Sequence, residues 1–301
     1  MRVLITGATG LIGKEIVAKC HNKGIAVNYL TTNKSKISKK ENYKGFYWST
    51  ETNTIDVDCI KGVDVIIHLV GASISKRWTT KQRQAILDSR IKTTALLYNT
   101  LKSNEHRVSQ IISASAIGYY PDSLTKYYNE KDIEVNTSFL GEIVEKWEEA
   151  VEAFKTLNII ISKIRIGIVF SSKGGAFPQL SKPVKYGVGA AMGTGKQWMS
   201  WIHIKDLTNM FMYVLEHKLE GTYNGVSPNP STNMEVTQAI AKQVKRPLFL
   251  PNIPKFIMAL VLGDMHAILF QSQRVSSQKI EDTGFNFKHY TLNGAIKALL
   301  Q

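Results

Sequence analysis

The chain has 301 residues, of which 44% are hydrophobic, so it can bury a substantial core. Its formal net charge of +14 raises the question of nucleic-acid binding. No basic run is interleaved with aromatic residues, and no helix-turn-helix or zinc-finger pattern is present. The composition therefore disfavours nucleic acid as a partner.

Only two cysteines, Cys20 and Cys59, occur, which excludes a disulfide framework and a cysteine metal cluster. This usage favours a reducing, cytoplasmic location. The start of the chain lacks the long apolar core of a secretory signal. Residues 256–270 are the most apolar later stretch, but they fall short of the about 20 residues that span a bilayer, so we expect no membrane partner.

The first half of the chain alternates apolar runs with amphipathic stretches. We expect strands at residues 2–7, 25–31, 63–71, 108–115 and 158–170, and helices at 11–24, 79–103 and from Phe139 onward. Strands of near-continuous Val, Ile and Leu separated by helices indicate a parallel sheet covered on both faces. The predicted fold is α/β, a Rossmann-like doubly wound parallel sheet.

The sequence pattern changes beyond residue 171, where the regular alternation of strands and helices gives way to glycine clusters in 173–177 and 186–203. A strand–helix–strand unit follows, and from Ser231 onward the chain is predicted to be mainly helical. We expect residues 1–171 plus 200–225 to form the NAD(P)-binding domain, and residues 172–199 plus 226–301 to form a smaller, mostly helical substrate-binding lobe.

A glycine-rich turn, TGATGLIG (6–13), follows the first strand and opens the first helix. Gly7 permits the tight turn, Gly10 lets the backbone approach a pyrophosphate, and Gly13 allows close helix–sheet packing. The helix N-terminus offers unpaired N–H groups to an anion. This strand–turn–helix context favours a dinucleotide cofactor over a glycine turn without a ligand.

The stretch YLTTNKSK (29–36) lies where an NAD site usually places a carboxylate on the ribose 2′-OH. It contains no carboxylate, whereas Thr31, Thr32 and nearby lysines could accept a 2′-phosphate. The stretch favours NADP, with NAD as the alternative. A solvated loop without a cofactor role is the competing interpretation.

Several motifs together carry a resemblance to a known superfamily. TGATGLIG, HLVGA (68–72), ISASAIGYY (112–120) and RIGIV (165–169) resemble the extended short-chain dehydrogenase/reductases. Three longer motifs resemble one atypical branch, the epimerase-family proteins that are NAD-dependent epimerase/dehydratase-like and carry a helical C-terminal domain of unknown function: VGASISKRWTTKQRQAILDSR (70–90), GKQWMSWIHIKDL (195–207) and NGVSPNPSTNMEV (224–236). The resemblance covers essentially the whole chain.

The resemblance implies NADP as cofactor and a homodimer built from helices that flank the sheet. It also implies the cofactor contacts, which are Gly7, Thr9, Gly10, Leu11, Ile12, Gly13, Thr31, Thr32, Leu69, Val70, Gly71, Arg90, Ser113 and Val169. One position departs from the branch, which often has Arg where this chain has Thr32. Thr32 therefore cannot form the two parallel hydrogen bonds that a guanidinium would donate to the 2′-phosphate.

The catalytic residues of the superfamily are a Ser, a Tyr and a Lys, and Ser115 matches the serine. Tyr and Lys would share one helix face at i and i+4. The residues at those positions here are Phe139 and Ile143, which continue as an apolar face through Trp147. Because these side chains have no exchangeable proton, this face cannot perform the usual acid–base chemistry.

A literal Tyr-x-x-x-Lys, Tyr127 and Lys131, occurs in a polar segment without an apolar helical face, so a loop tyrosine and a solvated lysine is the favoured interpretation. The remaining candidates for proton transfer are Ser115, Tyr119 and His203. Four further residues are predicted to line the substrate cleft, namely Tyr120, Gln197, Trp198 and Trp201.

Two functions follow from this reading. The favoured one is an NADP-dependent oxidoreductase or nucleotide-sugar-epimerase-like protein acting on a small polar substrate. The alternative is a non-catalytic NADP(H)-binding sensor or regulatory module that acts through a protein partner. The glycine turn favours both equally, and the missing Tyr/Lys pair favours the second.

Overall fold

The main sheet is built from parallel strands in the order β13-β9-β7-β6-β1-β2-β4, with the short antiparallel β3 at the edge. The computed structural model covers residues 1–301. The strands of the sheet are β1 (Arg2–Thr6), β2 (Ala26–Thr31), β3 (Lys39–Lys40), β4 (Tyr43–Ser49), β6 (Val65–His68), β7 (Gln110–Ala116), β9 (Ile160–Ile166) and β13 (Gly221–Gly225), with the short β5 (Thr54–Ile55) paired antiparallel to β4. The order confirms the doubly wound α/β fold.

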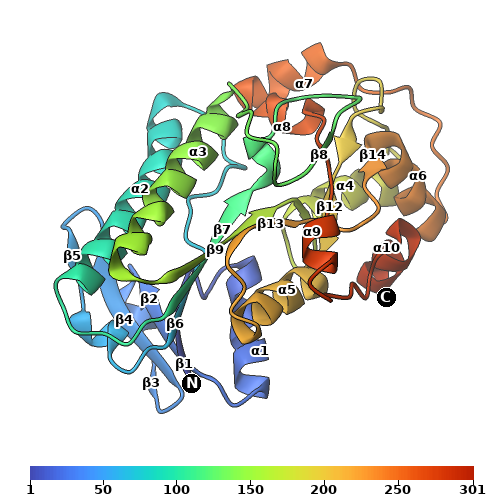
Figure 1. Cartoon of the computed structure of the whole chain (residues 1–301). Coiled ribbons are helices and arrows are strands. Elements are labelled where there is room, and N and C mark those ends of the chain that lie inside the picture. Colours follow the sequence, from blue (N-terminus) through green and yellow to red (C-terminus); the bar gives the residue numbers. More distant parts are fainter.

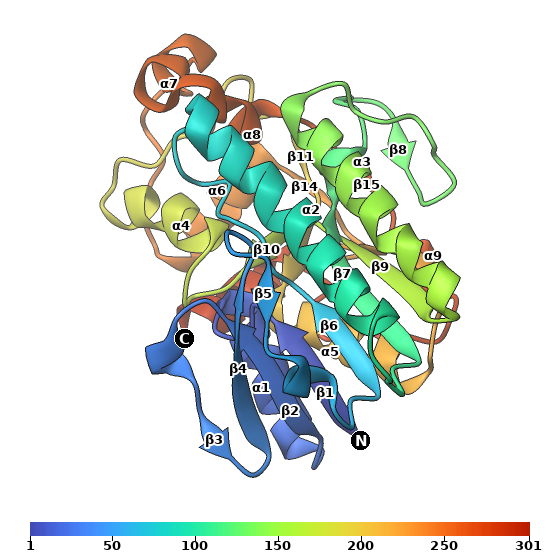
Figure 2. The same cartoon turned by 90° about the vertical axis from the view of Figure 1, so that its left-hand side faces the viewer.

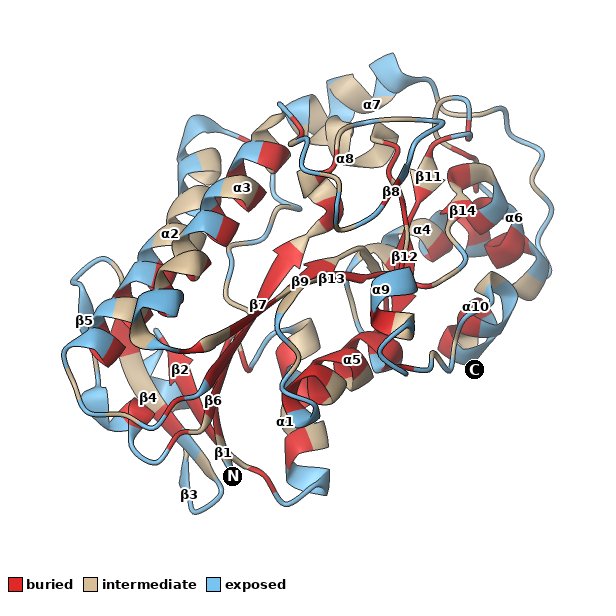
Figure 3. Cartoon of the chain, viewed as in Figure 1, coloured by how far each residue is buried: buried red, intermediate tan, exposed pale blue.

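Helices cover both faces of this sheet (Figures 1 and 2). On one face α2 (Thr80–Lys102) lies beside α3 (Phe139–Glu152), and on the other α1 (Leu11–Asn22) lies beside α5 (Ile204–Glu216). The strands between them are almost fully buried, as Figure 3 shows. Near-continuous Val, Ile and Leu in these strands is the sequence counterpart of burial on both faces.

Smaller elements surround the sheet. They are the strands β8 (Tyr127–Tyr128), β10 (Ile168–Phe170), β11 (Trp198–Met199), β12 (Trp201–His203), β14 (Ser231–Thr232) and β15 (Arg274–Val275), and the helices α4 (Ala176–Lys185), α6 (Asn233–Gln243), α7 (Lys255–Leu262), α8 (Ala267–Phe270), α9 (Gln278–Glu281) and α10 (Leu292–Leu300). Helices α4, α6 and α10 enclose a second apolar core. None of the helices combines the length and apolar character that crossing a bilayer requires.

Two strands differ from their expected form. The single strand expected at 158–170 is broken at Gly167, where a Cβ atom would lie 2.2 Å from the Ser200 carbonyl oxygen. Beyond this point β10 leaves the sheet and pairs with β12. Strand β4 was not expected, because its sequence YKGFYWS is not a continuous aliphatic run.

Candidate cofactor and catalytic site

The glycine turn joins β1 to α1 with the geometry of an anion-binding loop. Gly7 has φ +70°, and a Cβ atom on Gly13 would lie 2.2 Å from the Gly7 carbonyl oxygen. The N-cap of α1 is Gly10, without a side-chain cap and without an acidic residue in the first turn. Because no side chain occupies this helix end, its N–H groups are available to an anion.

A chain of hydrogen bonds fixes the segment that follows β6. The Thr6 hydroxyl accepts from the backbone N–H groups of Leu69 at 3.0 Å and Val70 at 3.3 Å. It also lies 2.9 Å from Nδ1 of His68, whose Nε2 lies 3.0 Å from the Thr94 hydroxyl. This chain places Leu69 and Val70, two predicted cofactor contacts, beside the glycine turn.

The tautomer of His68 follows from its neighbours. The Thr94 hydroxyl donates to the Arg90 carbonyl at 2.6 Å, so it accepts from His68 Nε2–H, and Nδ1 accepts from Thr6. Burial, helped by the charge of Arg90, lowers the pKa of His68 to about 3. His68 is therefore a neutral structural link between β1, β6 and α2.

Arg90 lies against the same segment. Its guanidinium donates to the Ile86 carbonyl at 2.9 Å, and its Cζ lies 5.0 Å from the centre of the Trp147 ring. A Cβ atom on Gly71 would lie 2.8 Å from Cζ of Arg90, so the glycine permits this approach. Burial lowers the pKa of Arg90 to about 10, which leaves it charged at neutral pH.

The end of β2 carries the residues predicted to face a 2′-phosphate. Thr31 is buried and its hydroxyl accepts from the Asn33 N–H at 3.1 Å, whereas Thr32 is exposed. Lys34 and Lys36 are exposed, and Nζ of Lys34 lies 4.9 Å from the centre of the Tyr47 ring. The strand end thus presents hydroxyls and cations to solvent without a carboxylate.

The remaining predicted cofactor residues differ in exposure. Thr9 is exposed, and Leu11, Ile12 and Val169 are half-buried. Ser113 is fully buried and its hydroxyl donates to the Ala114 carbonyl at 2.9 Å. Ser113 is therefore positioned inside the sheet rather than at its surface.

Ser115 is buried near the carboxyl end of β7, and its hydroxyl donates to Oε1 of Glu148 on α3 at 2.6 Å. One helix turn earlier, Val144 lies against Gly118, which follows β7. The stripe of α3 that meets the end of β7 therefore contains Leu140, Val144 and Glu148.

The stripe predicted from the superfamily pattern faces another neighbour. Phe139 packs edge-on against Trp78 at 5.2 Å between ring centres, and Ile143 joins a small apolar cluster with Trp78 and Ile86 of α2. The helix position next to Ser115 is thus offset by one residue from the expected position. It holds a carboxylate at Glu148.

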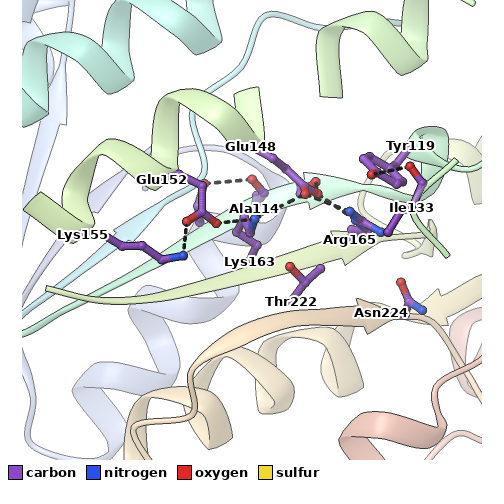
Figure 4. A network of polar contacts seen from close by, with 12 residues as sticks. Ala114, Tyr119, Ile133, Glu148, Glu152, Lys155, Lys163, Arg165, Thr222 and Asn224 are labelled. Carbon is purple, nitrogen blue, oxygen red and sulfur yellow. Dashed lines mark hydrogen bonds and ion pairs between the residues drawn. The ribbon is translucent and has the colours of Figure 1, made fainter. Parts of the chain in front are cut away.

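Glu148 belongs to a buried charged network (Figure 4). Arg165 on β9 donates to both of its oxygens, from Nε at 2.8 Å and from Nη2 at 2.9 Å. Burial alone opposes ionisation of Glu148, but the hydrogen bonds and charge of Arg165, with Lys163, outweigh it and lower the pKa of this carboxyl. Glu148 is therefore an ionised acceptor at neutral pH.

The network continues in two directions. Toward the sheet edge, Arg165 Nη1 donates to the Tyr120 hydroxyl at 3.1 Å, which donates to Asn224 at 2.8 Å. Toward solvent, Lys163 lies 3.5 Å from Oε2 of Glu148 and 2.6 Å from Glu152. Figure 4 shows Glu152 between Lys163 and the exposed Lys155.

Tyr119 and His203 occupy different places. Tyr119 lies against the network, with its ring centre 3.4 Å from Cζ of Arg165, and its hydroxyl donates to the Ile133 carbonyl at 3.2 Å. His203 caps α5, where Nδ1 accepts from the Lys205 N–H at 3.2 Å. It has no hydrogen bond to the Ser115 network, so the structure does not bring the three predicted catalytic residues together.

His203 is nevertheless unusual. It stacks on His289 with 3.8 Å between ring centres, and its Nε2 is buried without a partner. Burial first, and then the charge of His289, lowers the pKa of His203 to about 4. The ring is neutral near pH 7 and carries its proton on Nε2, because Nδ1 is already an acceptor.

The four predicted substrate residues are less open than expected. Tyr120 and Trp201 are 0% exposed, and Trp201 stacks on Phe170 in the second core. Gln197 is buried and donates to the carbonyls of Met192 and Leu269 at 3.1 Å. Trp198 alone is half-exposed, with Arg274 Cζ 4.3 Å from its ring centre. The burial of Tyr120, Gln197 and Trp201 places these three side chains in the interior rather than at an open surface.

The literal Tyr/Lys pair does not lie on a helix. Tyr127 is in β8 and Lys131 is in the turn that follows, so the two side chains share no helical face. Lys131 is exposed, as the interpretation of a solvated lysine requires, but Tyr127 belongs to a short strand that pairs with β15 rather than to a loop.

Sequence reasoning missed Glu148 and Arg165, although a signal was present. Lys163 and Arg165 interrupt an otherwise apolar strand, IISKIRI. Charged residues are almost never fully buried without partners. Two cations in a buried strand therefore predict carboxylates on the helix that covers the strand. These carboxylates are Glu148 and Glu152 of α3.

Comparisons with known proteins bear on the family of this chain. Residues 3–225 match the sequence model of the NAD dependent epimerase/dehydratase family, and residues 253–299 match a domain of unknown function, DUF1731. An epimerase family protein of Staphylococcus epidermidis is 33% identical over 301 residues, covering 100% of this chain and 99% of the relative. Another, from Staphylococcus haemolyticus, is 32% identical over 299 residues, covering 99% and 98%.

Two solved structures are similar over essentially the whole of this chain. The human epimerase family protein SDR39U1, solved with NADPH, has a TM-score of 0.85 and 26% identity, with 99% of each chain covered. The nucleoside-diphosphate sugar epimerase of Corynebacterium glutamicum has a TM-score of 0.80 and 26% identity, with 100% of this chain and 58% of that chain covered. The match over residues 3–225 and the whole-length relatives show that this chain belongs to the NAD-dependent epimerase/dehydratase family.

Proposed function

We propose that this protein binds NADP(H) and exchanges hydride with a small polar substrate, as an oxidoreductase or epimerase. The observation that carries the proposal is the N-terminus of α1, which has no side-chain cap and follows the turn from Gly7 to Gly10. A Cβ atom on Gly13 would overlap the turn at 2.2 Å, and no acidic residue occupies the first turn of the helix. Such a turn accommodates a pyrophosphate.

The preference for the 2′-phosphate rests on the exposed end of β2. Thr32, Lys34 and Lys36 would hold the phosphate, because no carboxylate is present there to repel it. The NADPH bound by the human relative supports this preference. NAD is the alternative, since Thr32 offers no bidentate contact.

Ser115 and Glu148 would replace the missing tyrosine and lysine in moving a proton. When bound, the nicotinamide ring supplies hydride exchange at its C4 atom. As a substrate alcohol loses its hydride, Ser115 Oγ would accept the hydroxyl proton and pass its own proton to Glu148 Oε1, 2.6 Å away. The products would be a carbonyl and a protonated Glu148, and reduction would run the same steps in reverse.

The neighbours of Glu148 would complete this relay. Arg165 and Lys163 keep the carboxylate ionised and ready to accept a proton. Lys163 then connects Glu148 to Glu152, which pairs with the exposed Lys155. This line of charged groups would return the proton from a buried site to solvent.

The substrate class proposed is a polar compound with an oxidisable hydroxyl, such as a sugar nucleotide. The Corynebacterium relative is a nucleoside-diphosphate sugar epimerase, which supports this class.

The alternative proposal is a non-catalytic NADP(H)-binding sensor. It is favoured by the apolar positions of α3, where Leu140 and Val144 adjoin Gly118 and Phe139 and Ile143 pack against α2. None of these four side chains can take part in proton transfer.

Two measurements test these proposals. Titration of the protein with NADPH, followed by nicotinamide fluorescence, should show saturable binding, and its absence at millimolar cofactor would refute both. A screen of sugar nucleotides and carbonyl compounds for NADPH oxidation should then find turnover that Ser115→Ala and Glu148→Gln abolish and the exposed-site control Glu149→Gln preserves. Cofactor binding without turnover across the panel would favour the sensor.

A further inference from the structure

Helix α7 lies at one end of the molecule (Figures 1 and 2), and most of its apolar side chains are exposed. Phe256 is 66%, Leu260 79% and Val261 65% exposed, and no residue of the helix is buried. With Ile257 these side chains follow the spacing i, i+1, i+4 and i+5, which places them on one side of the helix. A contiguous apolar ridge of this kind indicates a binding surface rather than scattered exposure.

Cations lie at both ends of this ridge. Lys255 is exposed at its start, and the N-terminal approach to α2 lies beside its end, since a Cβ atom on Gly263 would be 3.5 Å from Nε of Arg77. Lys76, Arg77 and Lys81 are all exposed.

Carboxylates are scarce around the ridge. The chain has none from Val65 to Leu87 and none from Val236 to Gly263. The next one, Asp264, is paired with Arg83 at 2.8 Å. The two segments that form the ridge and its flank, residues 65–87 and 236–263, therefore contain cations and no carboxylate.

We propose that this surface, the α7 face (Phe256, Ile257, Leu260 and Val261 with Lys76, Arg77, Lys81 and Lys255), binds the surface of an anionic lipid bilayer. An apolar ridge flanked by cations suits the interface of such a bilayer, where the ridge enters the headgroup region and the cations meet lipid phosphates. None of these residues is among the proposed cofactor contacts.

Charge argues against the other occupants of such a ridge. A symmetric contact between two copies would bring the same lysines and arginines together without carboxylates to pair with them. Nucleic acid would satisfy the cations but would leave Leu260 and Val261 against phosphates. An anionic bilayer satisfies both parts of the surface at once.

The sequence predicted no membrane partner because residues 256–270 are too short to span a bilayer. That argument concerns crossing only. An interfacial helix needs one apolar side and basic neighbours, and it remains parallel to the bilayer plane. The exposure of the ridge, which the sequence could not reveal, changes the expectation.

Vesicle sedimentation tests the proposal with the full chain. The protein should bind vesicles of phosphatidylcholine with about 30% phosphatidylglycerol more tightly than pure phosphatidylcholine, by about tenfold at low ionic strength. Phe256→Ser/Leu260→Ser should weaken binding to the anionic vesicles by at least about tenfold, because each side chain loses buried apolar area. Lys76→Glu/Lys81→Glu should weaken it by a similar factor.

Matched controls lie at exposed sites away from α7. Val57→Ser replaces another exposed apolar residue, and Lys39→Glu/Lys40→Glu makes the same charge change on β3; neither should alter binding. Circular dichroism melting of each variant shows that it folds. Three results would overturn the proposal: no binding to anionic vesicles, equal weakening by test and control variants, or a stable dimer that Leu260→Glu dissociates.

Discussion

The Ser115 hydroxyl and the Glu148 carboxylate meet across 2.6 Å, at the point where strand β7 passes beneath helix α3. Arg165 donates hydrogen bonds to both oxygens of Glu148, which keeps the carboxylate ionised. The ionised carboxylate accepts the hydroxyl hydrogen of Ser115, which is the only proton that this side chain can donate. Ser115 therefore offers lone pairs to whatever lies beyond it. In the proposed relay, a serine held this way would act first as a proton acceptor.

The Glu148–Arg165 pair should be essential for stability. Glu148→Ala leaves the Arg165 guanidinium buried without its partner, and we expect the free energy of unfolding to fall by about 3–5 kcal/mol. Urea denaturation followed by circular dichroism measures this change. Glu149→Ala removes an exposed carboxylate from the same helix and should change stability by less than about 0.5 kcal/mol. Equal effects of the two substitutions would contradict the assignment.

His68 should make the protein sensitive to mild acid. Its pKa is about 3 in the folded chain, below the ordinary value of 6.5, so the unfolded chain binds a proton first as the pH falls. The stabilisation is complete above pH about 6.5 and is lost toward pH about 3, by about 1.4 kcal/mol per pH unit.

Urea denaturation at several pH values checks this effect. His68→Asn should flatten the dependence of unfolding free energy on pH by that slope, whereas His21→Asn, at an exposed site, should retain it. His203, whose pKa is about 4, contributes equally to all three proteins and cancels in the comparison. A wild-type slope in His68→Asn would show that another group is responsible.

Gly13 should not tolerate a side chain. A Cβ atom there would lie 2.2 Å from the Gly7 carbonyl oxygen and 2.8 Å from Cα of Ala8, so α1 must move. We expect Gly13→Ala to lower the unfolding free energy by about 1–3 kcal/mol and to weaken NADPH binding. At Gly118 the nearest atom would be at an ordinary 3.6 Å, so Gly118→Ala is the matched control and should be tolerated. Calorimetric melting compares the two.

The cofactor preference should depend on the end of β2. Thr32→Asp places a carboxylate where a 2′-phosphate is proposed to bind, and it should raise the dissociation constant of NADPH by about tenfold while leaving that of NADH unchanged. Fluorescence titration with both cofactors measures the ratio. Thr125→Asp makes the same change at another exposed position and serves as control. Parallel weakening of NADPH and NADH would disprove a 2′-phosphate contact at Thr32.

The sequence was most informative where the chemistry is local. The strand, glycine turn and helix from Arg2 to Asn22 are adjacent in the chain, so their spacing alone predicts the anion site at Gly7 to Gly13. Strand β4 was missed because its aromatic and polar residues give no aliphatic run. The local hydrophobic pattern therefore predicts a strand well only where consecutive residues of that strand are buried.

The catalytic region required three dimensions. Helical periodicity establishes which residues of α3 share a face, but not which face meets the sheet. The structure shows that the stripe of Leu140, Val144 and Glu148 meets the end of β7. The same limit applies to Trp201 and Tyr120, whose aromatic character suggested a cleft and whose burial places them in the core.

The offset on α3 also bears on protein engineering. A designer who restored the superfamily pair at Phe139 and Ile143 would direct both side chains toward α2 and the Trp78 cluster, away from Ser115. The stripe that could present a tyrosine and a lysine to the end of β7 contains Leu140 and Val144. Glu148 would then lie one helical turn after the new lysine at position 144. A rebuilt active site would therefore have to accommodate a carboxylate that already accepts hydrogen bonds from Arg165.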